Sequence, residues 1–176
     1  MLAAVIMVAI AASASAQSAT EPTVRPLRFA WGAELGGGVE MSGHNMSTIG
    51  LNASFGMQWK WIRFFGVVAE ADIMVDNSSR TFPLALNFRT DFCQSRRLLF
   101  LDLRGGMALN YFDGEKQETG AYASGGLGVT LASGRTFSSH LIVGYTFIGR
   151  EQCYVGDRVR NCPGMSYVSM RIGVDF

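Results

Sequence analysis

The chain has 176 residues, the usual size of one domain, and its 15 Lys and Arg against 14 Asp and Glu give a net charge of +1. A nucleic-acid-binding protein would show a basic patch or stripe, so this balance argues against that class. Only 16% of the residues are charged while 48% are hydrophobic, which excludes a disordered chain and predicts an apolar surface.

The first segment of the chain has the features of a targeting sequence. Residues 1–16 are apolar, contain no charge, and end in Ala14-Ser15-Ala16 before Gln17. This pattern is typical of a secretory signal peptide with a small-residue cleavage site. The alternative is a membrane-anchoring helix, but the run is short for that and rich in Ala and Ser. We therefore expect a signal peptide at 1–16, followed by a polar periplasmic leader at 17–27.

Apolar and polar residues alternate through the rest of the chain, which is the pattern of a β-strand with two different faces. The last segment shows this best, because Val168, Met170, Ile172, Val174 and Phe176 fall on one face. The same alternation predicts eight strands, at 28–40, 47–59, 63–75, 81–92, 98–111, 119–132, 136–148 and 165–176.

The charged residues provide a test of this register. Beyond their first residues, five of the strands carry two charges each, and both charges always lie on the face opposite the apolar one. The pairs are Glu34 and Glu40, Glu70 and Asp72, Arg89 and Asp91, Asp102 and Arg104, and Arg171 and Asp175. A slip of one residue would move every charge to the other face, so these pairs support the assigned alternation.

Two architectures fit such strands. A soluble periplasmic carrier resembling a lipocalin would turn its apolar face inward around a ligand, whereas a membrane barrel turns it outward to lipid. The polar face is rich in Gly, which suits a crowded lumen, and short connections alternate with long ones, as in outer-membrane barrels. Aromatic residues also gather near the strand ends, as membrane girdles do. We assign Phe29, Trp31, Trp59, Trp61, Phe64, Phe65, Phe92, Phe137 and Phe176 to one girdle, and Phe82, Tyr111, Phe112, Tyr145, Phe147, Tyr154 and Tyr167 to the other.

The fold predicted from these patterns is all-β. Each strand of about 12 residues is long enough to cross the hydrocarbon core, which takes roughly 9–11 tilted residues. A sheet in a membrane must close to leave no open edge, and eight strands close into a barrel whose side chains fill the interior. We therefore predict an eight-stranded antiparallel up-and-down transmembrane β-barrel at 28–176.

At this point the chain resembles the small eight-stranded outer-membrane barrels of Gram-negative bacteria, of the OmpA transmembrane-domain and OmpX type. The resemblance rests on the eight alternating segments and on the ending Val-Ser-Met-Arg-Ile-Gly-Val-Asp-Phe at 168–176. It implies a location in the cell outer membrane, in contact with outer-membrane lipid and lipopolysaccharide. It also implies that Phe176 belongs to the signal that the barrel-assembly machinery reads. The resemblance implies no cofactor.

The charged residues of the polar face are expected to form a network of salt bridges and hydrogen bonds inside the barrel, because buried charges must be paired. Its expected members are Glu34, Glu70, Asp72, Arg89, Asp91, Asp102, Arg104 and Arg171. An ion path is the functional alternative. A general porin is disfavoured, since an eight-stranded barrel leaves no wide channel.

Two cysteines, Cys153 and Cys162, lie in the last long connection. In a disulfide-permissive compartment a bridge between them would stabilise the loop by roughly 2–3 kcal/mol. No His lies near them, so we expect no metal site. Cys93 is left over in a short turn and is expected to be a free thiol.

One residue raises the question of catalysis. His140 lies on the lumen face and follows Ser138 and Ser139, and some outer-membrane barrels modify lipid A with a His, a Ser and a carboxylate. Adjacency in sequence is not the geometry of a catalytic triad, so we expect no catalysis. A structural or surface-interaction role is favoured, with the outer loops as the surface most suited to binding a ligand. The lipid A-modifying enzyme and the soluble carrier remain the alternatives.

Overall fold

The computed structural model describes residues 27–43, 47–60, 62–75, 79–92, 98–111, 117–134, 136–149 and 164–176, and the backbone of 153–155 and 158–160. The expected signal peptide and nearly all of the expected leader fall outside the described residues, as do Cys93 and Cys162. No helix in the described part of the chain is long and apolar enough to cross a membrane.

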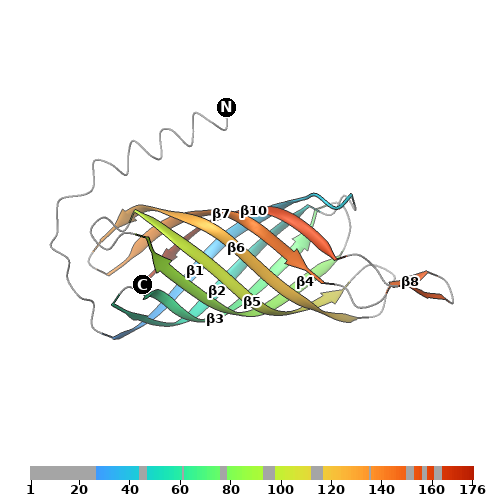
Figure 1. Ribbon diagram of the computed structural model, residues 1–176, viewed down its shortest axis with the longest axis horizontal. Coiled ribbons are helices and arrows are strands. Elements are labelled where there is room, and N and C mark those ends of the chain that lie inside the picture. Colours follow the sequence, from blue (N-terminus) through green and yellow to red (C-terminus); the bar gives the residue numbers. More distant parts are fainter. Residues whose placement is uncertain are drawn as a thin grey trace, which may run out of the picture.

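Eight long strands form a closed antiparallel barrel (Figure 1). They are β1 (Arg28–Glu40), β2 (Thr48–Trp59), β3 (Ile62–Met74), β4 (Arg80–Asp91), β5 (Leu99–Tyr111), β6 (Glu118–Ser133), β7 (Ser138–Ile148) and β10 (Met165–Asp175). Each strand pairs with its neighbour along the chain, and β1 pairs with β10 to close the ring. The predicted eight-stranded up-and-down barrel is confirmed, with every strand end within two residues of its expected position.

A short hairpin, β8 (Cys153–Val155) with β9 (Arg158–Arg160), was not expected from the sequence. It lies within the connection between β7 and β10, which we had read as a loop without strands. The hairpin extends beyond the barrel at the end opposite the C-terminus (Figure 1).

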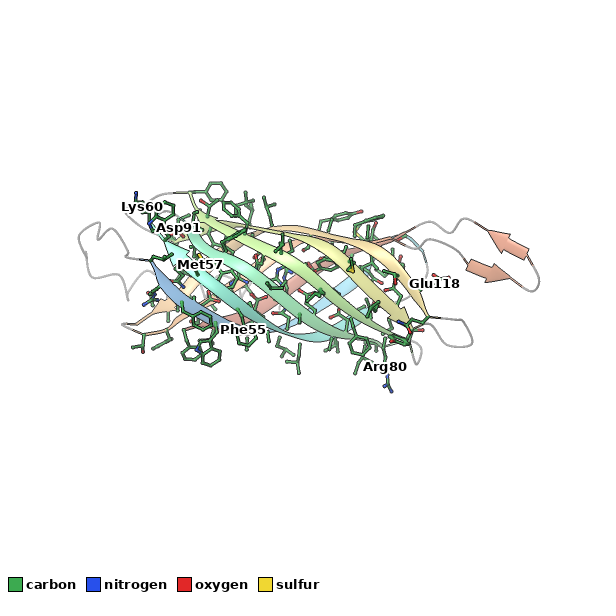
Figure 2. All side chains as sticks on the ribbon, turned by 90° about the horizontal axis from the view of Figure 1, so that it is seen from below. Phe55, Met57, Lys60, Arg80, Asp91 and Glu118 are labelled. Atoms are coloured by element: carbon green, nitrogen blue, oxygen red, sulfur yellow. The ribbon has the colours of Figure 1, made fainter. Side chains whose placement is uncertain are left out.

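The side chains of the barrel alternate between a buried and an exposed face, and the apolar residues occupy the exposed one. Phe55 and Met57 point away from the barrel (Figure 2). The decisive pair is Ile172, which is 50% exposed, and Arg171, which is 5% exposed. A carrier for an apolar ligand requires the reverse arrangement, so the structure contradicts the soluble-carrier alternative.

Two aromatic residues that we assigned to the outer girdles instead face the lumen. Phe64 is fully buried because it falls on the polar face of β3 together with Glu70 and Asp72, and the register shift between Ile62 and Phe64 turns the neighbouring Arg63 inward as well. Tyr167 is buried to 98% because it falls on the polar face of β10 together with Arg171. Strict alternation cannot reveal a bulge, and aromatic character alone does not decide the face.

The two ends of the barrel differ. At one end the strands are joined through 60–61, 92–98 and 134–137, and at the other through 41–47, 75–79, 112–117 and 149–164, which are longer on average. At the first end Phe176 stacks on Trp31, with the ring centroids 4.5 Å apart, and the two residues exchange backbone hydrogen bonds of 2.7 and 3.2 Å. This contact fastens the last strand to the first.

Candidate functional site

The lumen contains a network of ions, and Arg89 on β4 lies at its centre. The Arg89 guanidinium donates from Nε to Asp102 at 2.7 Å and from Nη1 to Asp175 at 3.0 Å, and its Nη2 is paired with Glu34. The side chain is fully buried. A buried guanidinium is stable only when its donors are satisfied by well-placed carboxylates, and here three strands supply them.

Arg104 on β5 also binds three carboxylates. Its Nη2 lies 2.6 Å from Glu34 and its Nε lies 3.1 Å from Asp102, while Nη1 is paired with Glu70. Glu34 and Asp102 are therefore each shared between Arg89 and Arg104. Each shared carboxylate lies between two guanidinium groups. More hydrogen-bond donors and acceptors are satisfied in this way than in two separate Arg–carboxylate pairs.

Arg171 and Glu70 extend the network toward the end with the long connections. Arg171 Nη2 lies 3.0 Å from Asp102 and 3.2 Å from the Ser124 hydroxyl, and its Nη1 lies 3.7 Å from Glu70. The Tyr122 hydroxyl donates to the second oxygen of Glu70 at 2.9 Å. These contacts tie β10 to β3, β5 and β6 across the lumen.

His140 completes the network from β7. Its Nε2 lies 3.2 Å from Glu34, and its Nδ1 lies 3.3 Å from Asp175 without the alignment of a hydrogen bond. A carboxylate therefore faces each nitrogen of the ring. The ring packs edge-on against Phe100, with the centroids 5.8 Å apart.

A separate polar cluster surrounds Arg63, near the end that carries the C-terminus. Its guanidinium donates to Thr130 at 2.8 Å and to Ser138 at 2.7 Å, and it lies 3.4 Å from Asp91. The guanidinium carbon also sits 4.3 Å from the centre of the Phe100 ring. The Phe100 ring thus contacts both Arg63 and His140.

The eight residues expected in the network divide into three groups. Six of them are joined by ion pairs, namely Glu34, Glu70, Arg89, Asp102, Arg104 and Arg171. Asp91 is paired with Arg63 instead. Asp72 has no hydrogen bond or ion pair with any other residue that the structure describes.

Our sequence reasoning left out four participants. Asp175 and His140 were placed on the lumen face but were not assigned to the network, Tyr122 was overlooked, and Arg63 was hidden by the bulge in β3. Tyr122 has the same parity in β6 as Glu118 and Ser124, and this pattern could have predicted that it faces the lumen. No signal in the sequence indicated the inward turn of Arg63.

Glycines on the facing strands make room for these large polar side chains. Gly173 pairs with Glu34, and a Cβ added to it would collide with the Glu34 side chain. Gly36 is related to Arg171 in the same way, where the added Cβ would lie 2.7 Å from Arg171 Cγ. At these two positions the Gly follows from the size of the ionic side chain opposite it.

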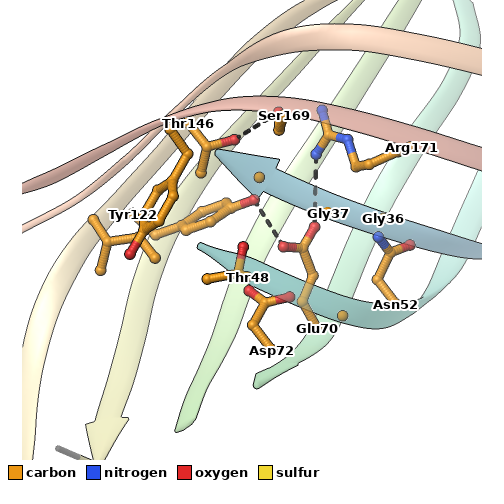
Figure 3. A pocket seen from close by; sticks show the side chains of 14 residues that line it. Gly36, Gly37, Thr48, Asn52, Glu70, Asp72, Tyr122, Thr146, Ser169 and Arg171 are labelled. Carbon is orange, nitrogen blue, oxygen red and sulfur yellow. Dashed lines mark hydrogen bonds and ion pairs between the residues drawn. The ribbon is translucent and has the colours of Figure 1, made fainter. Parts of the chain in front are cut away.

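Beyond the network lies a small polar pocket (Figure 3), toward the end with the long connections. Its lining includes backbone at Gly36, Gly37 and Gly38 and the side chains of Asn52, Asp72, Tyr122, Thr146 and Ser169. The Thr146 hydroxyl is hydrogen-bonded to Ser124 at 3.0 Å and to Ser169 at 3.1 Å. Most side chains that line the pocket carry a polar group, and Ile148 is the apolar exception.

The surroundings of His140 bear on catalysis. Within the described chain its polar neighbours are two carboxylates, and neither Ser138 nor Ser139 is hydrogen-bonded to it. Ser138 instead accepts a hydrogen bond from Arg63, and the Ser139 hydroxyl lies 3.5 Å from the Ala132 carbonyl. The nucleophile and base contact that acyl transfer requires is not formed by these residues.

Comparison with known proteins gives matches at the level of structure. No family model and no curated protein matches the chain. The N-terminal β-barrel domain of Pseudomonas aeruginosa OprF matches 84% of this chain and 97% of its own length, with a TM-score of 0.55 and 14% identity. Neisserial surface protein A (NspA) matches 86% of this chain and 98% of its own length, with a TM-score of 0.58 and 15% identity.

The chain has the fold of the small eight-stranded outer-membrane barrels. The resemblance stated from the sequence is confirmed for the fold. The identities are low, so the ionic network and the pocket are properties argued from this chain alone.

Proposed function

We propose that the protein is an integral outer-membrane β-barrel with a structural or surface-interaction role. The observation that carries this proposal is the combination of an apolar exterior and an ionic interior. In water such an exterior would be a large exposed apolar patch, which marks a surface that meets lipid or a partner.

The shape of the apolar surface favours lipid over a protein partner. Exposed apolar side chains occur on every strand of the ring, so no side of the barrel is reserved for water. One example from each strand is Leu35, Leu51, Val67, Leu86, Leu103, Leu127, Val143 and Met170. A protein partner covers one face of its target, whereas acyl chains surround a barrel on all sides.

The orientation proposed here places the long connections outside the cell. Outer-membrane barrels have short periplasmic turns and longer extracellular loops. The end with Trp31 and Phe176 then faces the periplasm, where Phe176 presents its aromatic side chain to the barrel-assembly machinery. The opposite end, with the β8–β9 hairpin, is exposed to lipopolysaccharide and to external ligands, whose identity the chain does not specify.

The ionic network supports a structural role for the barrel interior. Arg89, Asp102 and His140 are fully buried, so the middle of the lumen is filled with side chains that bind one another. A satisfied polar network of this kind rigidifies a protein. We propose that it replaces the apolar core of a soluble domain and holds the loops on a stiff support.

Fractionation of cells that express the chain tests the location. The protein should be recovered in the outer-membrane fraction, should require detergent for extraction, and should migrate faster on gels when it is not boiled. Recovery in the soluble periplasm without detergent would contradict the proposal.

The orientation is tested by labelling intact cells. A cysteine-free variant is given one Cys in the 150–163 connection, and a matched variant receives one Cys at 134–137. A thiol reagent that cannot cross membranes should modify the first and not the second. Labelling of only the second would show that the barrel has the opposite orientation.

A further inference from the structure

Asp72 is a lumen carboxylate that none of the ion pairs described above includes. The network contains the carboxylates of Glu34, Glu70, Asp102 and Asp175 and the guanidinium groups of Arg89, Arg104 and Arg171. His140 lies between Glu34 and Asp175, so it also belongs to these four carboxylates and not to Asp72. Arg63 and Asp91 form a neutral pair of their own. Asp72 is then a carboxylate for which these clusters hold no positive charge.

The position of Asp72 is fixed by the pairing of β2 with β3. Asp72 lies opposite Gly50, and a Cβ added to Gly50 would collide with the Asp72 carboxylate. Glu70, two residues along the same face, uses its oxygens for Arg104 and Tyr122. Figure 3 marks the contacts of Glu70 with Tyr122 and Arg171, and no marked contact reaches Asp72. The Asp72 carboxylate therefore lies over Gly50 in the lining of the pocket.

A second group in the pocket also has no partner. Asn52 pairs with Glu70 across β2 and β3, is 8% exposed, and lines the same pocket as Asp72. Its Oδ1 atom is buried without a hydrogen bond. A buried amide oxygen without a hydrogen bond is destabilising, so the Asn52 oxygen is suited to bind a ligand that carries a positive charge or a donor proton.

We propose that this pocket, between Asp72 and Asn52, binds a monovalent cation such as sodium or potassium. A single positive charge neutralises the one carboxylate that the network leaves over. The Asn52 amide oxygen and pocket hydroxyls such as that of Thr146 supply neutral oxygen ligands, which suit hard cations. Water molecules complete the coordination, since the pocket has room for a few of them.

The surroundings of the pocket disfavour a divalent metal. Arg171 lines the pocket, and Arg104 is bound to its Glu70, so a second positive charge on the ion would be repelled. The described residues contain no group of three or more His, Cys, Asp or Glu side chains suited to a metal ion. Asp72 is partly exposed, which leaves the site accessible to ions from solution.

The binding is tested by unfolding the purified barrel with urea in micelles of an uncharged detergent. Sodium chloride is replaced stepwise by the chloride of N-methyl-D-glucamine, a cation too large for the pocket, at constant ionic strength. A ligand that binds only the folded state lowers the unfolding equilibrium constant by the factor 1 + [L]/Kd. Once the site begins to saturate, a tenfold rise in sodium therefore lowers this constant up to about tenfold.

Two variants separate the pocket from the general charge of the lumen. Asp72→Asn should unfold equally in both salts, whereas Asp91→Asn, which makes the same change in the Arg63 cluster, should keep the sodium dependence. Loss of the dependence in both variants, or its persistence in Asp72→Asn, would overturn the proposal. The absence of any dependence in the wild type would show that a proton neutralises Asp72 instead.

Crystals soaked in rubidium chloride give a direct measurement that does not depend on variant folding. Rubidium replaces potassium, and its anomalous signal should appear between Asp72 and Asn52. A wild-type barrel without this signal would contradict the proposal. Cation binding by the lumen goes beyond the proposed function, because it does not depend on where the barrel is located or on which partner its loops bind.

Discussion

The role of the ionic network can be tested most sharply at Arg89, which binds three carboxylates. Arg89→Met removes the charge and keeps an unbranched side chain of similar length. Breaking a buried ion pair by removing one partner costs about 3–5 kcal/mol. Glu34 and Asp102 each keep Arg104, and Asp175 keeps His140. The expected loss in the free energy of unfolding is therefore nearer about 3 kcal/mol than the upper limit.

The assay is urea unfolding of the barrel in lipid vesicles, followed by tryptophan fluorescence. The double variant Arg89→Met with Asp102→Asn removes one charge of each sign, so it leaves the net charge of the network unchanged. We expect it to be more stable than the sum of the two single changes predicts, by about 0.5–3 kcal/mol, the coupling of residues in contact.

Arg28→Met is the matched control, because Arg28 is exposed and bound to Gln58 at 3.1 Å. Its effect should stay within about 0.5 kcal/mol, as for most surface substitutions. If Arg89→Met cost no more than Arg28→Met, the network would not stabilise the barrel as argued here.

Three further predictions concern the exterior, the packing of the lumen and the outer loop. Val143→Arg places a charge on the apolar exterior and should lower stability by about 2–4 kcal/mol near the bilayer midplane, and an unchanged folding yield in vesicles would refute the lipid-facing assignment. Gly128→Ala should cost about 1–3 kcal/mol because the new methyl group would collide with Phe100, while Gly105→Ala, with open space around it, should not lower stability. The free energy of unfolding of the two variants is compared, and equal effects would contradict the tight contact between Gly128 and Phe100. Cys153 and Cys162 should be joined in the mature protein, which mass spectrometry without reductant checks, and two free thiols there would reject the bridge.

The fold could be predicted from the sequence because a barrel in lipid has two chemically opposite faces. Alternation with a period of two then specifies the strands, and charges such as Asp102 and Arg171 fix which face lies inside. The ring closure between β1 and β10 followed from the requirement that a membrane sheet have no open edge. The β8–β9 hairpin was missed because its strands of three residues are too short for alternation to be recognised.

The sequence predicted which face of the strands carries the ionic network better than it predicted which residues pair within the network. Parity places Asp72 and Glu70 on the same side, but it does not say that Arg104 reaches Glu70 and leaves Asp72 without a partner. The contribution of Arg63 depends on a register shift in β3 that follows from local backbone geometry. Which charged side chains pair across the lumen depends on the stagger of the strands and on the length and rotamer of each side chain. Neither can be predicted from the sequence of one strand.

The ion pairs also constrain the order of events during insertion into a bilayer. Arg89 meets Asp102 across one hairpin, but Glu34 and Asp175 lie 55 and 86 residues away in the chain, and His140 meets Glu34 across 106 residues. A hairpin that entered the hydrocarbon alone would expose bare ions to acyl chains, at a cost of several kcal/mol for each. The sheet must therefore close almost completely at the membrane–water interface. Its charged side chains are then already paired when they enter the hydrocarbon core together.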